Sequence, residues 1–211
     1  MRYLWPAGGD VGMGVLAAPN MLGVPEAIAN GAEWAADLGC LEGPDWVKHC
    51  DVEKARAWLF ETMAKYRCQC LFVTMPDRVG NADGTLAAFH QLRPRFLGWS
   101  LAYVAQDGSE TLPFPYGAHT IFIGGSTEWK MSDAASSVIQ RAVAERKHVH
   151  IGRVNNWQRY AHFRGLPNSA SFTCDGTRLR WERDKALADW LSYPSRPYTL
   201  RLYAHTGGPD A

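Results

Sequence analysis

Short apolar runs rich in β-forming residues alternate with helical patterns along this chain. The runs cover residues 14–18, 33–36, 69–74, 100–105, 120–123, 148–151 and 169–173. Each run is mostly apolar rather than strictly alternating, which is typical of strands covered on both faces. The helical patterns occupy residues 52–66, 84–92, 133–147, 157–164 and 182–191. This order of elements predicts βα units and a parallel sheet.

Two details support the helical part of this pattern. In residues 52–66, the side chains of Ala55, Leu59 and Met63 recur at helical spacing and form an apolar stripe. Ser132 directly precedes the helical segment 133–147, where a serine hydroxyl commonly caps the first turn. We therefore expect amphipathic helices between several of the strands.

The number of predicted strands and the chain length limit the possible architectures. Seven or eight parallel strands fit either a (β/α)8 barrel or an open doubly wound sheet. The 211 residues, 46% of them hydrophobic, suffice for one domain with a substantial core, and no linker or low-complexity tract divides residues 1–211. A (β/α)8 barrel of this size would be compact and trimmed, because such barrels typically need about 250 residues.

Polar residues follow six of the predicted strands at the point where each strand ends. They are Asp37, Asp77 after Met75-Pro76, Gln106 with Asp107, Gly124-Gly125-Ser126 with Glu128, Gly152-Arg153 with Asn155, and Asp175-Gly176-Thr177. A barrel brings the carboxyl ends of all its strands to one site, whereas a doubly wound sheet concentrates functional groups at one switch point. The distribution therefore favours a barrel enzyme. Taken singly, each aspartate also fits a turn or helix cap, and each glycine fits a tight turn.

Metal and nucleophile signatures are weak in this sequence. Cys68 and Cys70 would point to opposite faces of a strand, and no second pair completes a zinc set. His148 and His150 share one strand face, where core packing or a hydrogen bond inside the barrel is favoured over metal binding. The sequence has no G-x-S-x-G, H-E-x-x-H or P-loop motif, which argues against serine or zinc hydrolysis and ATP-driven chemistry. We predict no metal and no cofactor.

Cysteine usage and hydropathy bear on the compartment. Five cysteines at irregular positions fit reduced thiols better than a disulfide framework. No apolar run approaches the roughly 18 residues of a membrane helix, and the first residues lack the pattern of a signal peptide. We therefore expect a soluble cytoplasmic protein.

The charges are distributed unevenly along the chain. Residues 1–140 contain 10 basic and 15 acidic residues, whereas residues 141–211 contain 12 basic and 6 acidic ones. The excess of basic residues suits a surface that faces phosphates, but a solvated basic face is the favoured explanation. Charge alone is thus a weak indication of nucleic-acid binding.

In their order along the chain, these clusters resemble the tRNA-guanine transglycosylase superfamily. They are more similar to its DNA-modifying relatives in phages and bacteria, the DpdA (deoxypurine in DNA protein A) family. For a member encoded by a phage, the expected location is the host cytoplasm. The resemblance spans about residues 35–177, and its most specific stretches are residues 122–130 (FIGGSTEWK), 150–155 (HIGRVN) and 174–177 (CDGT). Shorter and weaker matches lie at residues 35–40 (AADLGC), 75–77 (MPD) and 105–108 (AQDG).

This resemblance implies a pentosyltransferase that exchanges guanine in a polynucleotide for a 7-deazaguanine base. Asp175 matches the family's nucleophile, which forms a covalent aspartyl-sugar intermediate, and Asp37 matches its general acid and base. The remaining matches are to substrate-binding positions. They are Asp77 for the guanine N1–H and 2-amino group, Gln106 and the backbone N–H near Gly124 and Gly125 for O6, and Arg153 and Asn155 for phosphate or the pocket wall.

Two departures from the tRNA enzymes bear on the substrate. After Asp37 the sequence reads Leu38-Gly39-Cys40-Leu41, without the stacking aromatic of those enzymes, and no cysteine follows Cys174 to build their zinc module. The resemblance therefore implies DNA as the partner, with a preQ0-like 7-deazaguanine base as the small-molecule substrate, and the basic residues from Arg178 onward would contact the backbone. The alternatives are a tRNA acceptor, and a catalytically silent nucleic-acid-binding module in which both aspartates are turn residues.

Overall fold

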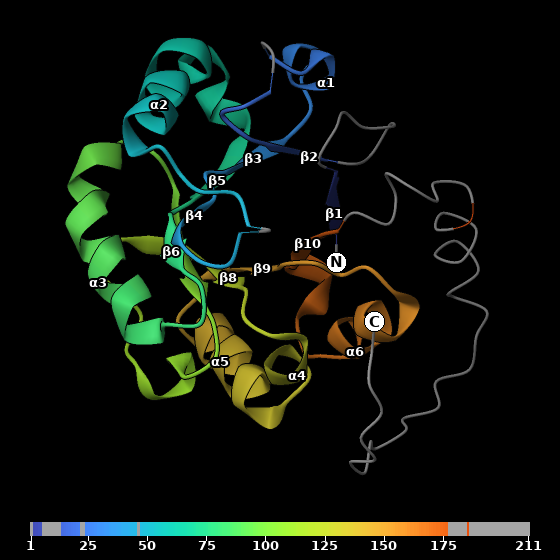
Figure 1. Ribbon diagram of the computed structural model, residues 1–211. Helices are drawn as coiled ribbons and strands as arrows, with labels where there is room; N and C mark the ends of the chain where they lie inside the picture. Colours follow the sequence, from blue (N-terminus) through green and yellow to red (C-terminus); the bar gives the residue numbers. More distant parts are fainter. Residues whose placement is uncertain (1, 6–13, 22–23, 46, 177–184, 186–211) are drawn as a thin grey trace.

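Parallel strands form a barrel with helices packed around its outside (Figure 1). The computed structural model describes residues 2–5, 14–21, 24–45, 47–176 and 185. The predicted helix at 182–191, with Arg178 and the basic residues that follow it, lies outside these ranges except for Lys185. No helix in the described ranges is both long enough and apolar enough to cross a membrane.

The barrel strands follow one another around the ring in the order β1-β10-β9-β8-β7-β5-β3-β2, and each neighbouring pair is parallel. Strand β1 pairs with both β10 and β2 and so joins the two ends of the sheet. The strands are β1 (Arg2–Trp5), β2 (Gly14–Ala17), β3 (Trp34–Asp37), β5 (Cys70–Thr74), β7 (Leu101–Ala105), β8 (Ala118–Ile123), β9 (His148–Ile151) and β10 (Thr173–Asp175). The prediction of an α/β fold with a parallel barrel is confirmed.

The described helices are few and mostly short. They are α1 (Glu26–Ala29), α2 (Val52–Ala57), α3 (Ala82–Leu92), α4 (Thr127–Lys130), α5 (Asp133–Ala144) and α6 (Trp157–Arg164). Ser132 caps α5 as predicted, since its hydroxyl accepts a hydrogen bond from the Ala135 N–H at 3.4 Å. The buried face of α5 packs on β8 and β9.

Two of the predicted elements change conformation along their length in the structure. The helix predicted over residues 52–66 ends at Ala57 and continues as the π-helical turn Trp58–Thr62, in which the Met63 N–H donates to the Trp58 carbonyl at 3.0 Å. The strand predicted over residues 169–173 is instead the 3-10 turn Ser169–Ser171, followed by β10. Serine hydroxyls there donate to nearby backbone carbonyls, which favours a turn over a strand.

The barrel interior is packed separately from the layer between strands and helices. Its buried core consists of Leu16, Ala35, Phe72 and Ala102, with Phe122 packed against them. Because side chains of a strand alternate between its two faces, the residue two positions beyond an interior residue also faces inward. Counting two residues onward from Ala35, Phe72 and Phe122 places Asp37, Thr74 and Gly124 at the carboxyl-end opening of the barrel, called the barrel mouth below. Gly152 and Asp175 follow the buried His150 and Thr173 in the same way and lie at the same opening.

A small second sheet lies beside the barrel mouth and was not predicted. Its two parallel strands are β4 (Cys40–Glu42) and β6 (Asp77–Arg78). Each strand follows a barrel strand after a short connection, β4 after β3 and β6 after β5. The pairing places Cys40 opposite Asp77, and thus fixes two segments that extend from the barrel mouth.

Candidate active site at the barrel mouth

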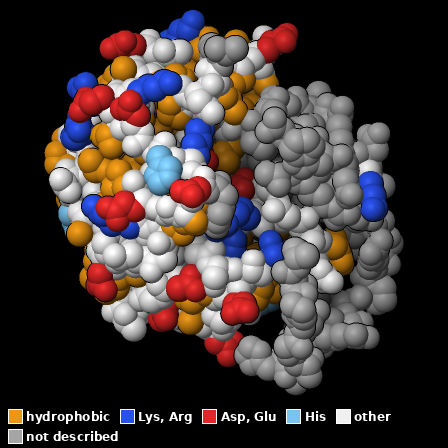
Figure 2. Space-filling model, viewed as in Figure 1, with side chains coloured by type: hydrophobic (Ala, Val, Ile, Leu, Met, Phe, Trp, Pro, Cys, Tyr) orange, Lys and Arg blue, Asp and Glu red, His pale blue; other side chains and the backbone are white. Residues whose placement is uncertain are grey.

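The structure brings the two predicted catalytic aspartates together. Asp37 is the last residue of β3 and Asp175 the last residue of β10. They lie close enough that the negative charge of Asp175 contributes to raising the pKa of Asp37. Figure 2 shows acidic and basic side chains bordering a recess near the middle of this face. Nothing in the sequence spacing of the two residues predicted this proximity, which results from barrel closure.

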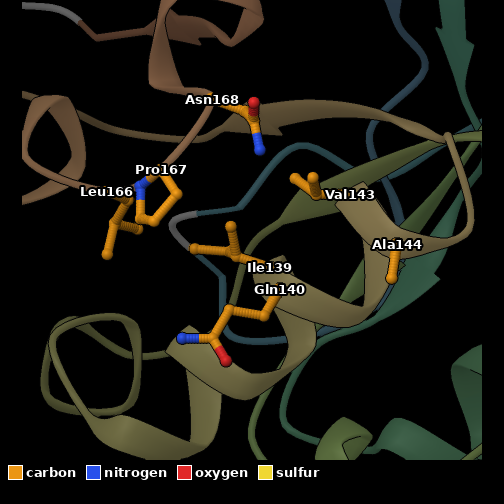
Figure 3. A pocket seen from close by; sticks show the side chains of 7 residues that line it. All are labelled: Ile139, Gln140, Val143, Ala144, Leu166, Pro167 and Asn168. Atoms are coloured by element: carbon orange, nitrogen blue, oxygen red, sulfur yellow. The ribbon is translucent and has the colours of Figure 1, made fainter.

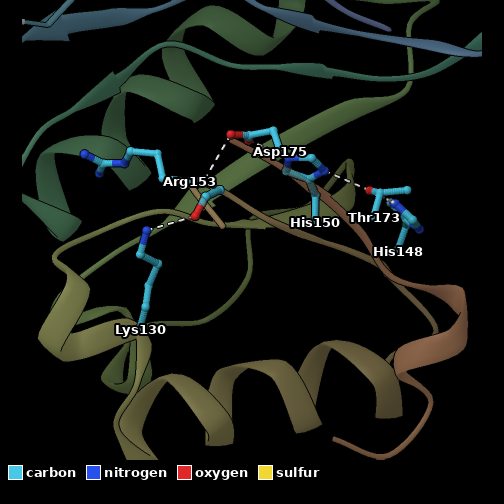
Figure 4. A network of polar contacts seen from close by, with 7 residues as sticks. Lys130, His148, His150, Arg153, Thr173 and Asp175 are labelled. Atoms are coloured by element: carbon cyan, nitrogen blue, oxygen red, sulfur yellow. Dashed lines mark hydrogen bonds and ion pairs between the residues drawn. The ribbon is translucent and has the colours of Figure 1, made fainter. Parts of the chain in front are cut away.

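Asp175 is held by two hydrogen bonds, one on each carboxylate oxygen (Figure 4). The Arg153 N–H donates to Oδ1 at 3.0 Å, and His150 Nε2 lies 2.9 Å from Oδ2. The Asp175 backbone carbonyl accepts from the Val154 N–H at 2.6 Å. Asp175 is 8% exposed, so these hydrogen bonds hold a largely buried carboxylate in place.

Asp37 occupies a different electrostatic environment. Burial raises the pKa of its carboxyl group; the Gly39 N–H, which donates to Oδ1 at 3.0 Å, lowers it, and Asp175 raises it further. The positive charge of Lys48 opposes this shift without reversing it. Gly39 has a φ of +86°, and a Cβ there would lie 2.5 Å from the Lys48 carbonyl oxygen, so only glycine fits this turn. Asp37 therefore retains a proton to higher pH than an ordinary aspartate.

Asp77 lies opposite Cys40 in the small sheet and receives a hydrogen bond from its thiol. Burial raises the pKa of Asp77 to about 6, the Cys40 thiol lowers it, and Asp37 raises it. Burial and the charge of Asp77 raise the pKa of the Cys40 thiol to about 12, so the thiol stays protonated and donates. Asp77 is thus an ionised carboxylate at neutral pH in the neighbourhood of Asp37.

We expect Asp77→Asn to stabilise the protein at pH 8 by about 1 to 2 kcal/mol and to have little effect near pH 4. The folded protein holds the Asp77 proton up to about pH 6, whereas an aspartate of ordinary pKa 3.8 releases it earlier. The wild-type free energy of unfolding therefore falls as the pH rises between these two values, and the neutral amide removes that loss. Urea unfolding at both pH values measures the effect. The exposed Asp45→Asn is the matched control, and an equal gain at both pH values contradicts the prediction.

Gln106 does not take the predicted position of a base-reading donor. Its side chain is 1% exposed and its polar atoms are engaged within the chain. Nε2 donates to the Arg78 carbonyl at 2.9 Å and to Thr85 Oγ1 at 2.6 Å, and Oε1 accepts from the Gly80 N–H at 2.7 Å. These contacts tie β7 to β6 and α3, so Gln106 has a structural role.

The two glycines after β8 allow close approach of the surrounding loops. A Cβ on Gly124 would lie 2.8 Å from Val104, and one on Gly125 would lie 2.6 Å from Asp107 Oδ2. Gly125 also has a φ of +71°, which favours glycine. Hydrogen bonds from Ser126 to Asp107 fix this loop. Within the described part of the chain the Gly125 N–H has no hydrogen-bond acceptor, so it is available to a ligand.

Arg153 links three loops of the barrel mouth. Its backbone adopts a φ of +58°, its N–H donates to Asp175, and its Nη2 donates to the Gly125 carbonyl at 3.0 Å. The Arg159 Nη1 donates to the Arg153 carbonyl at 3.2 Å and brings a second guanidinium to the same loop. Asn155 is half-buried two residues beyond, and its N–H donates to the Arg153 carbonyl at 3.0 Å. The exposed Arg153 side chain is positioned to contact an anionic group.

Sequence reasoning missed two residues at this site. Lys130, from α4, is 2% exposed and its Nζ donates to the Gly152 carbonyl at 2.9 Å; burial, with a smaller effect of Arg153, lowers its pKa to about 7. Thr74 is opposite Asp37 in the register of β3 and β5, and its buried hydroxyl has no hydrogen-bond partner among the described residues. Lys130 lies in the stretch 122–130 that carries the family resemblance, so the resemblance could have indicated it. Thr74 lies in an apolar strand, where no sequence pattern distinguishes its hydroxyl as functional.

A metal centre or a cavity elsewhere in the fold would be an alternative to the site at the barrel mouth. The described residues contain no group of three or more histidines, cysteines, aspartates or glutamates placed to hold a metal ion. A cavity of about 220 Å³ lies between α5 and the segment after α6 (Figure 3). Its lining residues are Ile139, Gln140, Val143, Ala144, Leu166, Pro167 and Asn168. This cavity contains no charged side chain and none of the predicted site residues.

Comparison with protein-family models finds no match to this chain, and comparison with curated proteins finds none either.

Proposed function

We propose that this protein is a DNA guanine transglycosylase of the DpdA type, built on a trimmed (β/α)8 barrel. It exchanges guanine for a 7-deazaguanine base through a covalent aspartyl-sugar intermediate. The observation that carries the proposal is the environment of the two aspartates at one barrel mouth. Asp175 is fixed by two hydrogen bonds, whereas burial and the neighbouring carboxylate raise the pKa of Asp37. Paired carboxyl groups with different protonation suit cleavage of a glycosidic bond.

In the first half of the reaction, a carboxylate oxygen of Asp175 attacks C1′ of the target nucleotide. The Oδ–C1′ bond forms as the C1′–N9 bond breaks, and the electron pair of the broken bond passes to the departing guanine. Asp37 donates its proton to that base, which leaves as neutral guanine. The raised pKa of Asp37 supports this role, because the group must arrive protonated.

In the second half, the incoming 7-deazaguanine base replaces guanine. Its N9 attacks C1′, the Oδ–C1′ bond breaks, and the electron pair returns to the Asp175 carboxylate. The N9 proton passes to the Asp37 carboxylate, which restores the starting protonation of both aspartates. The exchange is balanced without ATP, metal or redox chemistry, because one glycosidic bond replaces another.

Base recognition is assigned to Asp77 and the Gly125 N–H. The Asp77 carboxylate would accept hydrogen bonds from the guanine N1–H and 2-amino group, and its thiol partner Cys40 helps to fix its orientation. The Gly125 N–H would donate to O6 in place of Gln106, whose side chain is engaged elsewhere. Adenine would leave these groups unpaired, at a cost of about 1 to 3 kcal/mol for each.

Backbone recognition is assigned to the basic groups that border Asp175. Arg153 is exposed beside this residue, and Arg159 contacts the same loop. Guanidinium groups bind phosphates through paired N–H donors, which would position the nucleotide without reading its sequence.

The test is an exchange assay with the purified protein. Duplex DNA or tRNA is incubated with ¹⁵N-labelled guanine, and the nucleosides are then analysed by mass spectrometry. We expect the label in deoxyguanosine of the DNA. Label only in the tRNA would overturn the choice of acceptor, and label in neither would support the silent binding module. Mass spectrometry of DNA and tRNA from cells that express the protein then identifies any deazaguanine incorporated.

A further inference from the structure

His150 occupies the barrel interior directly beneath the carboxylate of Asp175. Its side chain is fully buried. The rings of Phe72 and Phe122 flank the imidazole, with ring centroids 4.9 Å and 4.6 Å away. The imidazole therefore has little freedom to rotate, and its Nε2 is directed at Asp175 Oδ2.

A chain of hydrogen bonds leads from His150 through the interior to a second histidine (Figure 4). His150 Nδ1 lies 2.8 Å from Thr173 Oγ1, and the same hydroxyl oxygen lies 2.8 Å from His148 Nε2. Thr173 is also fully buried. Figure 4 shows that these side chains project in a row from the neighbouring strands β9 and β10.

One direction of donation satisfies this chain with an ionised Asp175 and neutral imidazoles. A neutral imidazole carries one N–H and one acceptor nitrogen, whereas a hydroxyl both donates and accepts. His148 Nε2 then donates to Thr173 Oγ1, the Thr173 hydroxyl donates to His150 Nδ1, and His150 Nε2 donates to Asp175 Oδ2. Every hydrogen bond in the row is directed toward the carboxylate.

We propose that His150 is a positioning residue for the nucleophile, and that Thr173 fixes its Nε2–H tautomer. This inference rests on the proposed function of Asp175. In the free enzyme, His150 and the Arg153 N–H hold both oxygens of the Asp175 carboxylate in place. After attack on C1′, the same donors stabilise the ester oxygens, and the geometry for the return step is retained. A displacement of about 1 Å in such an arrangement can cost about 100-fold in rate.

The first test compares exchange by variants of the chain. We expect His150→Leu to lower kcat for guanine exchange about 30- to 100-fold, with KM for DNA unchanged, because Asp175 loses its internal donor while the cavity remains filled. His150→Gln carries an amide N–H near the Nε2 position and should recover kcat to within about 5-fold of wild type. Thr173→Val removes only the hydroxyl and should lower kcat about 10-fold. A folded His150→Leu that keeps kcat within 2-fold of wild type overturns the proposal.

The second test does not depend on activity. ¹⁵N NMR of histidine-labelled protein reports which ring nitrogen of His150 carries the proton. We expect a protonated Nε2 and an unprotonated Nδ1, with the Nε2–H resonance shifted by Asp175→Asn and the tautomer mixed in Thr173→Val. A proton on Nδ1 alone in the wild type overturns the proposed direction. If the wild-type protein performs no exchange, the proposed function fails, while this measurement still decides whether the hydrogen-bonded chain exists.

Discussion

Asp175→Asn is expected to lower guanine exchange by at least about 1,000-fold and to remove the covalent adduct with DNA. An amide oxygen is a poor nucleophile and cannot neutralise the positive charge that develops at C1′. The substitution retains the shape of the side chain and an acceptor for the Arg153 N–H, so the barrel mouth should stay intact. Incorporation of ¹⁵N-guanine measures the rate, and intact-mass analysis of protein trapped on an oligonucleotide measures the adduct.

The matched control is Asp133→Asn, at an exposed carboxylate in the first turn of α5. It makes the same chemical change away from the barrel mouth and should leave both readouts unchanged. An equal melting temperature for the two variants separates loss of chemistry from loss of fold. Should Asp175→Asn retain a tenth or more of the wild-type exchange rate, the covalent mechanism is wrong whatever the acceptor.

The periodicity of the sequence predicted most of the barrel. Residues 148–151 and 157–164 were predicted with the bounds of β9 and α6 as observed, and the strands over 69–74 and 100–105 begin one residue later in the structure. The pairing of strands that are far apart in the sequence was harder to predict. Strand β1 has only four residues, yet it closes the ring, and the small sheet joins segments whose pairing depends on the ends of β3 and β5. Local propensity does not encode such contacts.

The candidate site was predictable in position but not in detail. Polar residues after successive strands of a parallel barrel lie at the same end of it, and the structure places Asp37 near both Asp77 and Asp175. The direction of a side chain depends on its neighbours, and these are absent from a linear pattern. The side chain of Gln106 forms hydrogen bonds with the Gly80 N–H and the Arg78 carbonyl, because a buried amide is rarely left without hydrogen-bond partners. The hydrogen bond between His150 and Asp175 could not be predicted either, because it depends on the register in which β9 and β10 pair.

The second large effect is expected from Asp37→Asn, which should slow adduct formation on guanine-containing DNA about 100- to 1,000-fold. The asparagine cannot donate an acidic proton to the departing base. DNA that carries N7-methylguanine should be much less affected, since this base is already positively charged and leaves as a neutral species without a donated proton. Single-turnover adduct formation on the two DNAs, for wild type and variant, measures the difference. The site should accept the methyl group because the proposed 7-deazaguanine substrate bears a substituent at the same ring position.

The pH dependence provides an independent check on the role of Asp37. In the wild type, adduct formation on guanine DNA should decrease as the pH rises through the raised pKa of Asp37, because only the protonated form donates. With N7-methylguanine DNA, or in Asp37→Asn, this decrease should be absent. Asp175→Asn should instead abolish adduct formation on both DNAs at every pH, since the nucleophile is needed whichever base leaves. Equal losses on the two DNAs in Asp37→Asn would show that Asp37 orients Asp175 rather than supplying the proton, and the assignment of the general acid would be wrong.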